Sequence, residues 1–178
     1  MKMKIFLNVL CLACLLLISC GDDKNETEDV DAAKKAQQQQ PLITEDAIEK
    51  FDYTDYALSS ESEERLENWK KYQELAIQIS YLKKADLSFF NSEKEPLKKF
   101  LDEFNKSVPK TLRTNQILSR IAILETNMLK LNENLNLDNI EDRLKLMGVK
   151  DVLEAFSNLN YQINKKLERD FYDKIKPE

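Results

Sequence analysis

The sequence has 178 residues, 27 of them basic and 32 acidic, and it contains no histidine and only two glycines. Without histidine, the Ser-His-Asp and Cys-His nucleophile systems, the His-Glu-x-x-His zinc helix and the Glu-x-x-His di-iron site of helical bundles are all excluded. A chain of net negative charge is also a poor general partner for nucleic acid. Composition therefore predicts a protein that is not an enzyme, uses no cofactor or metal, and binds no nucleic acid.

Residues 1–19 have the organisation of a secretory signal peptide. Two lysines precede a mostly apolar run over residues 5–18, which is shorter than the about 20 residues that span a bilayer. The run ends in Leu-Ile-Ser-Cys at residues 17–20. This motif resembles the lipobox of bacterial lipoproteins. The resemblance implies cleavage after Ser19 and a lipid anchor on the sulfur of Cys20.

The three cysteines support an anchor rather than a disulfide framework. Cys11 and Cys14 would leave with the signal peptide and lipid would occupy Cys20, so no disulfide is expected in the mature chain. Loss of the two leader lysines would leave 25 basic residues against 32 acidic ones, a net charge of −7. Because such a surface is repelled by anionic headgroups, we expect the lipid itself to make the membrane contact.

Residues 20–42 are predicted to be a disordered tether. The segment is rich in Asp, Glu, Lys and Gln and has few residues that could bury a core. About 20 flexible residues reach roughly 25 Å, enough to lift a domain off the headgroups. The pair Asp22 and Asp23 resembles the export tag of Bacteroidetes-type lipoproteins, which implies the outer membrane and the cell surface. The alternatives are a solvated acidic linker and the periplasmic face.

Residues 43–178 are predicted to form one helical domain. Their number is sufficient for a core, and no stretch alternates apolar and polar residues for long, so no strand is expected. The first helix begins after Thr44, a typical N-cap residue followed by two acids. It is expected to end at Ala57 or Leu58.

Two Ser-x-x-Glu capping boxes mark the next two helices. The box at residues 60–63 starts the second helix, whose apolar residues recur at steps of three or four as far as residue 82. The box at residues 92–95 starts the third helix, and Ser-Val-Pro at residues 107–109 ends it.

The fourth helix has the most regular pattern, with apolar residues spaced alternately four and three apart in an a/d seam. A short helical segment capped by Asp138 is expected to stop at Gly148, and the last helix to run from about Lys150 to Lys174. The seam comprises Ile117, Ile121, Leu124, Met128, Leu131 and Leu135. The stripe of the last helix comprises Val152, Phe156, Leu159, Ile163, Leu167, Phe171 and Ile175.

Four main helices joined by short loops predict an all-α fold, an antiparallel bundle with short additional helical segments. The seam could alternatively join two copies of the chain. It spans fewer than three heptads, however, and every neighbouring helix has a stripe of its own to bury. The pattern therefore favours an intramolecular bundle and a monomer over a homodimer.

The functional prediction is a lipid-anchored, non-catalytic domain that binds or scaffolds another envelope protein; the alternative is a small-ligand pocket between helices. Phe89 and Phe90 are the candidate contacts, because adjacent residues cannot both lie at the centre of one helical stripe. One is expected to pack and the other to meet a partner or ligand. Residues 142–170 are similar in style to small helical Bacteroidetes lipoproteins of unassigned activity, and this resemblance implies no functional residues.

Overall fold

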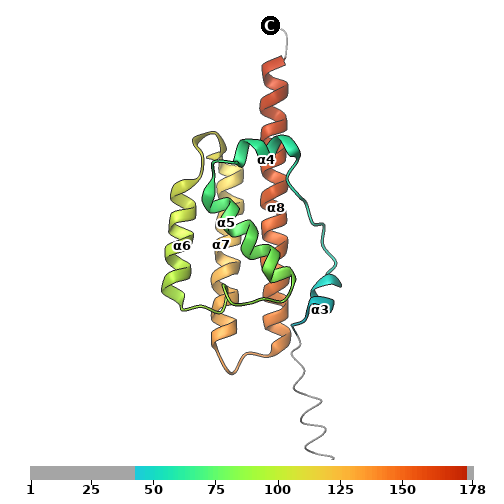
Figure 1. Cartoon of the computed structure of the whole chain (residues 1–178), viewed down its shortest axis with the longest axis vertical. Coiled ribbons are helices and arrows are strands. Elements are labelled where there is room, and N and C mark those ends of the chain that lie inside the picture. Colours follow the sequence, from blue (N-terminus) through green and yellow to red (C-terminus); the bar gives the residue numbers. More distant parts are fainter. Residues whose placement is uncertain (1–42, 176–178) are drawn as a thin grey trace, which may run out of the picture. The chain divides into compact units, whose positions relative to one another are not determined.

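The structure is a computed structural model that describes residues 43–175. The chain divides into two units, Met1–Pro41 and Leu42–Glu178, and the described residues belong to the second. Over the described residues this unit is entirely helical, with no strand, which confirms the predicted fold class (Figure 1). The elements are α3 (Glu45–Glu49), α4 (Ser60–Leu66), α5 (Lys70–Lys83), α6 (Lys94–Ser107), the 3₁₀ helix η1 (Lys110–Leu112), α7 (Asn115–Asn136) and α8 (Asp142–Ile175).

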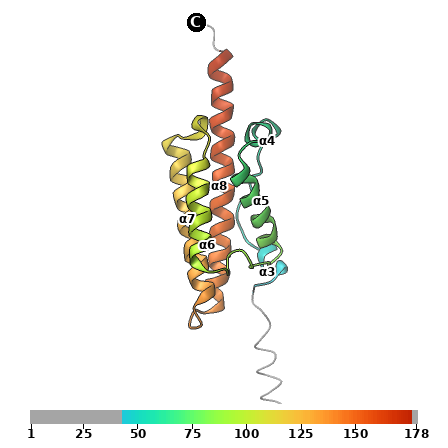
Figure 2. The ribbon, with the colours of Figure 1, turned by 60° about the vertical axis from the view of Figure 1, so that its left-hand side comes forward.

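Helix α8 is the central element of the bundle. Figure 2 shows it between α6 and α7 on one side and α3, α4 and α5 on the other. The four long helices α5 to α8 alternate in direction along the bundle, so the predicted antiparallel arrangement is confirmed (Figure 1). The most extensive packing is between α7 and α8.

The a/d seam of α7 faces the core of the intramolecular bundle. Its first five members are buried, and Leu135 is partly buried. The seam packs in one continuous core with buried residues of α8 such as Val152 and Leu159. Residues at steps of three and four therefore face a neighbouring helix of the same chain.

Gly148 lies within α8, so the predicted helix stop at this residue is wrong. Helix α8 is continuous from Asp142 to Ile175, and it begins at Asp142 rather than directly after Asp138. Gly148 has no positive φ, and it is buried against Leu131 and Asn134 of α7. A Cβ atom built at Gly148 would lie 3.1 Å from Cδ1 of Leu131. The absent side chain thus allows α7 and α8 to approach closely.

Two predicted helices in the N-terminal half have different ends in the structure. The first ends at Glu49 instead of residue 57 or 58. The second is divided into α4 and α5 by a break at residues 67–69. Trp69 at this break is buried, and its Nε1 donates to Oγ of Ser107 at 3.0 Å. Burying Trp69 against the end of α6 thus turns the chain between α4 and α5.

The predicted cap Thr44 is confirmed, since its Oγ1 accepts from the backbone N–H of Ala47 at 3.2 Å, whereas the caps predicted at Ser60 and Ser92 are each displaced by one residue. Ser59, not Ser60, caps α4, and its Oγ accepts from the backbone N–H of Ser62 at 3.2 Å. Helix α6 begins after Glu93, which makes no side-chain cap, and Oγ of Ser92 instead donates to the carbonyl of Phe89 at 2.9 Å. The end of α6 at Ser107 agrees with the sequence.

Candidate functional site

The C-terminal end of α8 extends past the helices that cover the rest of it (Figure 1). The predicted stripe is buried as far as Leu167, which is 5% exposed, but Phe171 is 47% and Ile175 58% exposed. The prediction of a buried stripe to residue 175 is therefore wrong over its last two members. We call residues 168–175 the α8 terminus.

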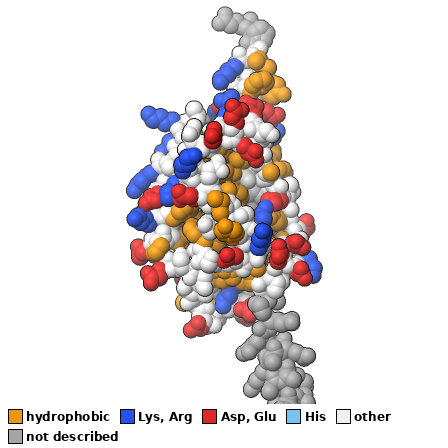
Figure 3. Space-filling model, in the orientation of Figure 1, with side chains coloured by type: hydrophobic (Ala, Val, Ile, Leu, Met, Phe, Trp, Pro, Cys, Tyr) orange, Lys and Arg blue, Asp and Glu red, His pale blue; other side chains and the backbone are white. Residues whose placement is uncertain are grey.

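The α8 terminus carries a compact group of apolar side chains. Tyr172 is 55% exposed, and its ring meets the ring of Phe171 edge-on at a centroid distance of 5.8 Å. Ile175 lies one turn further along the same helix. Figure 3 shows hydrophobic side chains gathered over this end of the described chain. Such a group provides aromatic anchors for another molecule.

Two grooves flank the α8 terminus. One, of about 330 Å³, lies between the start of α4 and α8, and Phe171 and Tyr172 form part of its wall. The other, of about 380 Å³, lies between α4, the η1 region and α8. Leu167 contributes to both grooves. The apolar end of α8 therefore stands between two concave surfaces.

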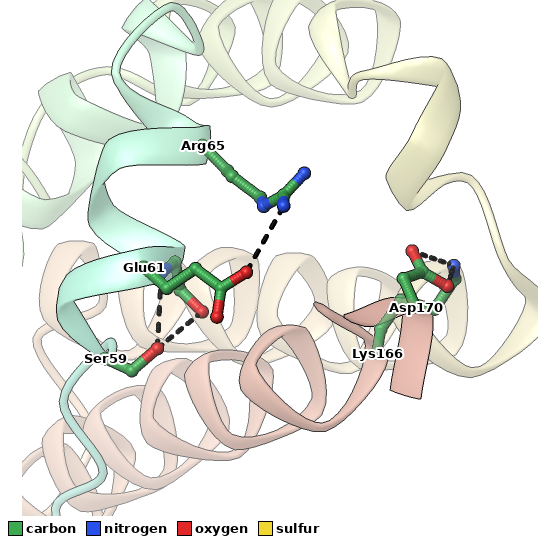
Figure 4. A network of polar contacts seen from close by, with 6 residues as sticks. Ser59, Glu61, Arg65, Lys166 and Asp170 are labelled. Carbon is green, nitrogen blue, oxygen red and sulfur yellow. Dashed lines mark hydrogen bonds and ion pairs between the residues drawn. The ribbon is translucent and has the colours of Figure 1, made fainter. Parts of the chain in front are cut away.

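Several charged side chains beside these grooves form ion pairs. Glu61 and Arg65 of α4 form an ion pair of 3.2 Å, and Lys166 pairs with Asp170 on α8 (Figure 4). Because these ion pairs are partly or well exposed, they add little stability. Their effect is to surround the aromatic group with charges of both signs, as in the polar rim of a protein interface.

A larger cleft of about 730 Å³ lies between residues 55–58, α4, α5 and α8. Tyr72, Phe156 and Asn160 line it. Burial, and to a smaller extent the charge of Glu63, raises the pKa of Tyr72 well above its usual range. The Tyr72 hydroxyl donates to Oδ1 of Asn160 at 2.7 Å. This phenol is a protonated donor already engaged with a neighbour, so it is not a ready acid or nucleophile.

Phe89 and Phe90 differ in the way expected of adjacent aromatic residues. Phe90 is 0% exposed and belongs to the core, so it offers no surface for a contact. Phe89 is partly buried, and it meets Phe90 and Phe100 edge-on at centroid distances of 5.1 and 5.2 Å. The prediction of a partner or ligand contact thus stays with Phe89 alone.

Cys20, Asp22 and Asp23 lie outside the described residues, so their lipidation and export roles stay predictions. Within residues 43–175, no helix combines the length and the apolar character needed to cross a bilayer. The same part of the chain contains no group of three or more acidic or cysteine side chains placed to hold a metal ion.

Comparison of the chain with protein-family models, with curated proteins and with solved structures finds no match. The α8 terminus was not among the sites predicted from the sequence. The sequence feature that marks this site is the continuation of the apolar stripe by Phe171 and Ile175. These residues extend the stripe of α8 past the part of the helix that the shorter helices cover.

Proposed function

We propose that this chain is a lipid-anchored envelope protein whose helical domain binds another protein through the α8 terminus and catalyses no reaction. One observation carries the proposal: the apolar stripe of α8 continues two turns past its last buried residue, Leu167. Phe171, Tyr172 and Ile175 are each about half exposed on this continuation.

The chemistry of this surface favours a protein partner over a small molecule. Aromatic side chains framed by paired charges are typical of the central anchors and polar rim of protein interfaces. The exposed residues occupy successive turns of one helix, the arrangement in which a helix places anchors in a groove of its partner. The grooves beside Leu167 can in turn receive side chains of that partner.

The anchoring part of the proposal is supported by the sequence alone. The lipobox at residues 17–20 and the acidic pair Asp22 and Asp23 favour an outer-membrane lipoprotein exposed at the cell surface. The periplasmic face is the alternative. Intact-mass measurement of protein purified from membranes tests the lipid anchor. A mass equal to that of the chain from Cys20 without any modification would contradict lipidation.

A small-ligand function is the second candidate, and the 730 Å³ cleft favours it. This volume lies within the range of roughly 300–1,000 Å³ of small-molecule sites. Two features count against it. The cleft is open, and the hydroxyl of Tyr72 on its floor already bonds to Asn160. The α8 terminus is therefore the preferred site.

Site-specific photocrosslinking in native membranes tests the proposal. A photoreactive phenylalanine replaces Tyr172 in one variant and Tyr81 in a matched control, because Tyr81 on α5 is also about half exposed at 48%. We expect one defined protein to crosslink from position 172 and not from position 81. Crosslinks from position 81 alone would move the interface to α5, and none from position 172 would reject the α8 terminus.

A further inference from the structure

The end of the bundle opposite the α8 terminus carries a second group of exposed apolar side chains. Leu137 begins the connection between α7 and α8, and Leu144 and Met147 lie on the first two turns of α8. Their exposed fractions are 43%, 46% and 48%. The connection extends past the ends of α5 and α6 in both views (Figure 1 and Figure 2). We call residues 137–147 the hairpin tip.

The exposed residues of the hairpin tip lie on its outer surface. Leu144 and Met147 are three residues apart on α8, so their side chains are neighbours on one face of the helix. Leu146 lies between them in sequence but packs against the core. The tip therefore has its own contribution to the core and, in addition, apolar side chains that the described helices leave exposed.

The described chain begins at this same end of the bundle. Residues 54–59 run along α8 in the direction of the helix. The carbonyl of Thr54 accepts from Oγ of Ser157 at 2.6 Å. The N–H of Ser59, five residues later, donates to Oδ1 of Asn164 at 3.0 Å. The chain before residue 54 therefore lies toward the start of α8, where both views show α3 beside it (Figure 1 and Figure 2).

The position of Ile43 decides which apolar group is nearer to a lipid on Cys20. Ile43 packs against the core, so the chain from Cys20 joins the bundle at the end that carries the hairpin tip. The predicted tether reaches roughly 25 Å. Tyr172 lies about 40 Å further along the continuous helix α8 than Leu144. A bilayer within reach of the tether thus meets the hairpin tip before the α8 terminus.

The charge of the hairpin tip does not oppose contact with lipid headgroups. The chain from Cys20 has a net charge of −7, but residues 137–150 contain three acidic and three basic residues. Lys145 pairs with Asp142 at 3.8 Å. The acids of α3 are exposed at the same end, but the tip extends further than α3 (Figure 1). Because salt screens charges beyond about 10 Å, the excess negative charge elsewhere acts only weakly at the tip.

We propose that Leu137, Leu144 and Met147 insert into the surface of the bilayer that holds the lipid anchor, so that the domain stands on the hairpin tip with the α8 terminus directed away from the membrane. This inference rests on the lipid anchor of the proposed function. Aliphatic side chains at the end of a helical hairpin can enter the headgroup boundary without a specific pocket. A weak contact is sufficient, because the anchor keeps the tip at a high effective concentration near the bilayer.

A second copy of the chain is less favoured as the occupant of this surface. A two-fold contact through the hairpin tip would bring the α3 helices of both copies to the same interface. Glu45, Asp46 and Glu49 make this helix acidic, and like charges facing each other oppose association. A bilayer of electrically neutral lipid presents no such opposing charge.

The test uses the lipidated chain in vesicles of phosphatidylcholine with brominated acyl chains, which quench tryptophan fluorescence on contact. Trp69 is the only tryptophan, and its burial makes it a constant background. Leu144→Trp adds a reporter at the hairpin tip. Ile77→Trp on α5 and Tyr172→Trp at the α8 terminus are matched controls, because these side chains are also about half exposed at 51% and 55%. We expect the added fluorescence to be quenched at position 144 and at neither control.

Removing the other apolar side chains of the tip tests whether they hold it at the bilayer. In the Leu144→Trp chain, Leu137→Gln and Met147→Gln should weaken the contact on the order of ten-fold, with loss of most of the quenching. The matched pair Ile77→Gln and Tyr81→Gln removes as many exposed apolar side chains from α5 and should leave the quenching unchanged. All four positions are exposed, so the far-UV circular dichroism spectrum should be preserved.

Several outcomes would overturn the inference. Equal quenching at positions 77, 144 and 172 would show a domain without a preferred orientation, and quenching at position 77 alone would place α5 on the bilayer. A doubled sedimentation mass that the tip substitutions return to the monomer value would assign the tip to a second copy. Intact mass of the same sample separates the two proposals. An unmodified Cys20 would reject the anchor and the tip contact together, whereas a lipidated chain without quenching at position 144 would reject the tip contact alone.

Discussion

Replacing Gly148 by alanine tests how closely α7 and α8 approach each other. The new Cβ would lie 3.1 Å from Cδ1 and 3.7 Å from Cβ of Leu131, and 3.8 Å from Nδ2 of Asn134. Only the first distance is shorter than an ordinary van der Waals contact. Leu131 is fully buried, so its side chain has little room to move away.

Two opposing effects set the size of the change. Alanine is favoured over glycine in a helix interior by about 1 kcal/mol. Overpacking of a filled core costs about 1–3 kcal/mol. Because the close contact is with a buried branched side chain, we expect the strain to be larger, and Gly148→Ala to lower the free energy of unfolding by about 1 kcal/mol.

The same substitution should have the opposite sign once Leu131 is shortened. Leu131→Ala removes the Cδ1 atom at 3.1 Å and by itself costs about 2–5 kcal/mol. In that background Gly148→Ala should stabilise the protein by about 1 kcal/mol, since only the helix preference remains. The coupling between the two sites is then about 2 kcal/mol.

Equilibrium urea denaturation of the four proteins, followed by far-UV circular dichroism, measures this cycle. The reversal of sign is the decisive result, because it depends on one atom pair and not on the overall stability. If Gly148→Ala stabilises both backgrounds by the same amount, α7 and α8 do not approach as closely as the structure has them, and the reasoning fails.

Three further substitutions test polar groups of the bundle. Asn132→Leu removes the Nδ2 donor that reaches the carbonyls of Phe90 at 2.8 Å and Ser92 at 2.7 Å, so urea denaturation should show a loss of about 2 kcal/mol. Burial raises the pKa of Glu125 despite the hydrogen bond from Asn105, so the charged carboxylate opposes folding at pH values above its usual pKa. Glu125→Gln should therefore stabilise the protein by a few tenths of a kcal/mol at pH 7, and this gain should be absent at pH 3, where the carboxyl group is protonated in both the folded and the unfolded chain. Burial likewise raises the pKa of Tyr72, so stability present below about pH 10 should fall as the pH rises further, and Tyr72→Phe should weaken that fall in denaturation measured at several pH values.

The hydrophobic period located the buried faces because it depends only on local helix geometry. The α7 seam from Ile117 to Leu131 is buried throughout, as its spacing requires. The period gives no information on where one helix is divided into two. The break before Lys70 depends on Trp69, whose place against Ser107 at the end of α6 is set by tertiary packing.

Gly148 shows a second limit of local reasoning. Glycine is typical of a helix end because it tolerates the left-handed conformation that many such ends need. In α8 the same residue is used for its small size, since Leu131 occupies the space of a side chain. The sequence alone does not distinguish these two uses, because the second depends on a contact with a helix that lies elsewhere in the sequence.

The α8 terminus was missed for a related reason. A stripe identifies an apolar face but not the element that covers it, and Phe171 continues the spacing of Leu167 without a change of pattern. The difference appears only when helix lengths are compared in space. Helix α8 has 34 residues, whereas α5 and α6 have 14 each, so the bundle cannot cover the full length of its central helix.

The contact between α8 and the segment before α4 also had a signal in the sequence. Ser157, Asn160 and Asn164 are spaced by three and four residues, the same period that marks a buried face, but their side chains are polar. In the structure all three form hydrogen bonds with the main chain of residues 54–59. A buried polar side chain requires a hydrogen-bonding partner, and an extended main chain provides donors and acceptors. The helical spacing identifies this polar face, but it does not identify the segment that meets it, because that segment lies about 100 residues earlier in the chain.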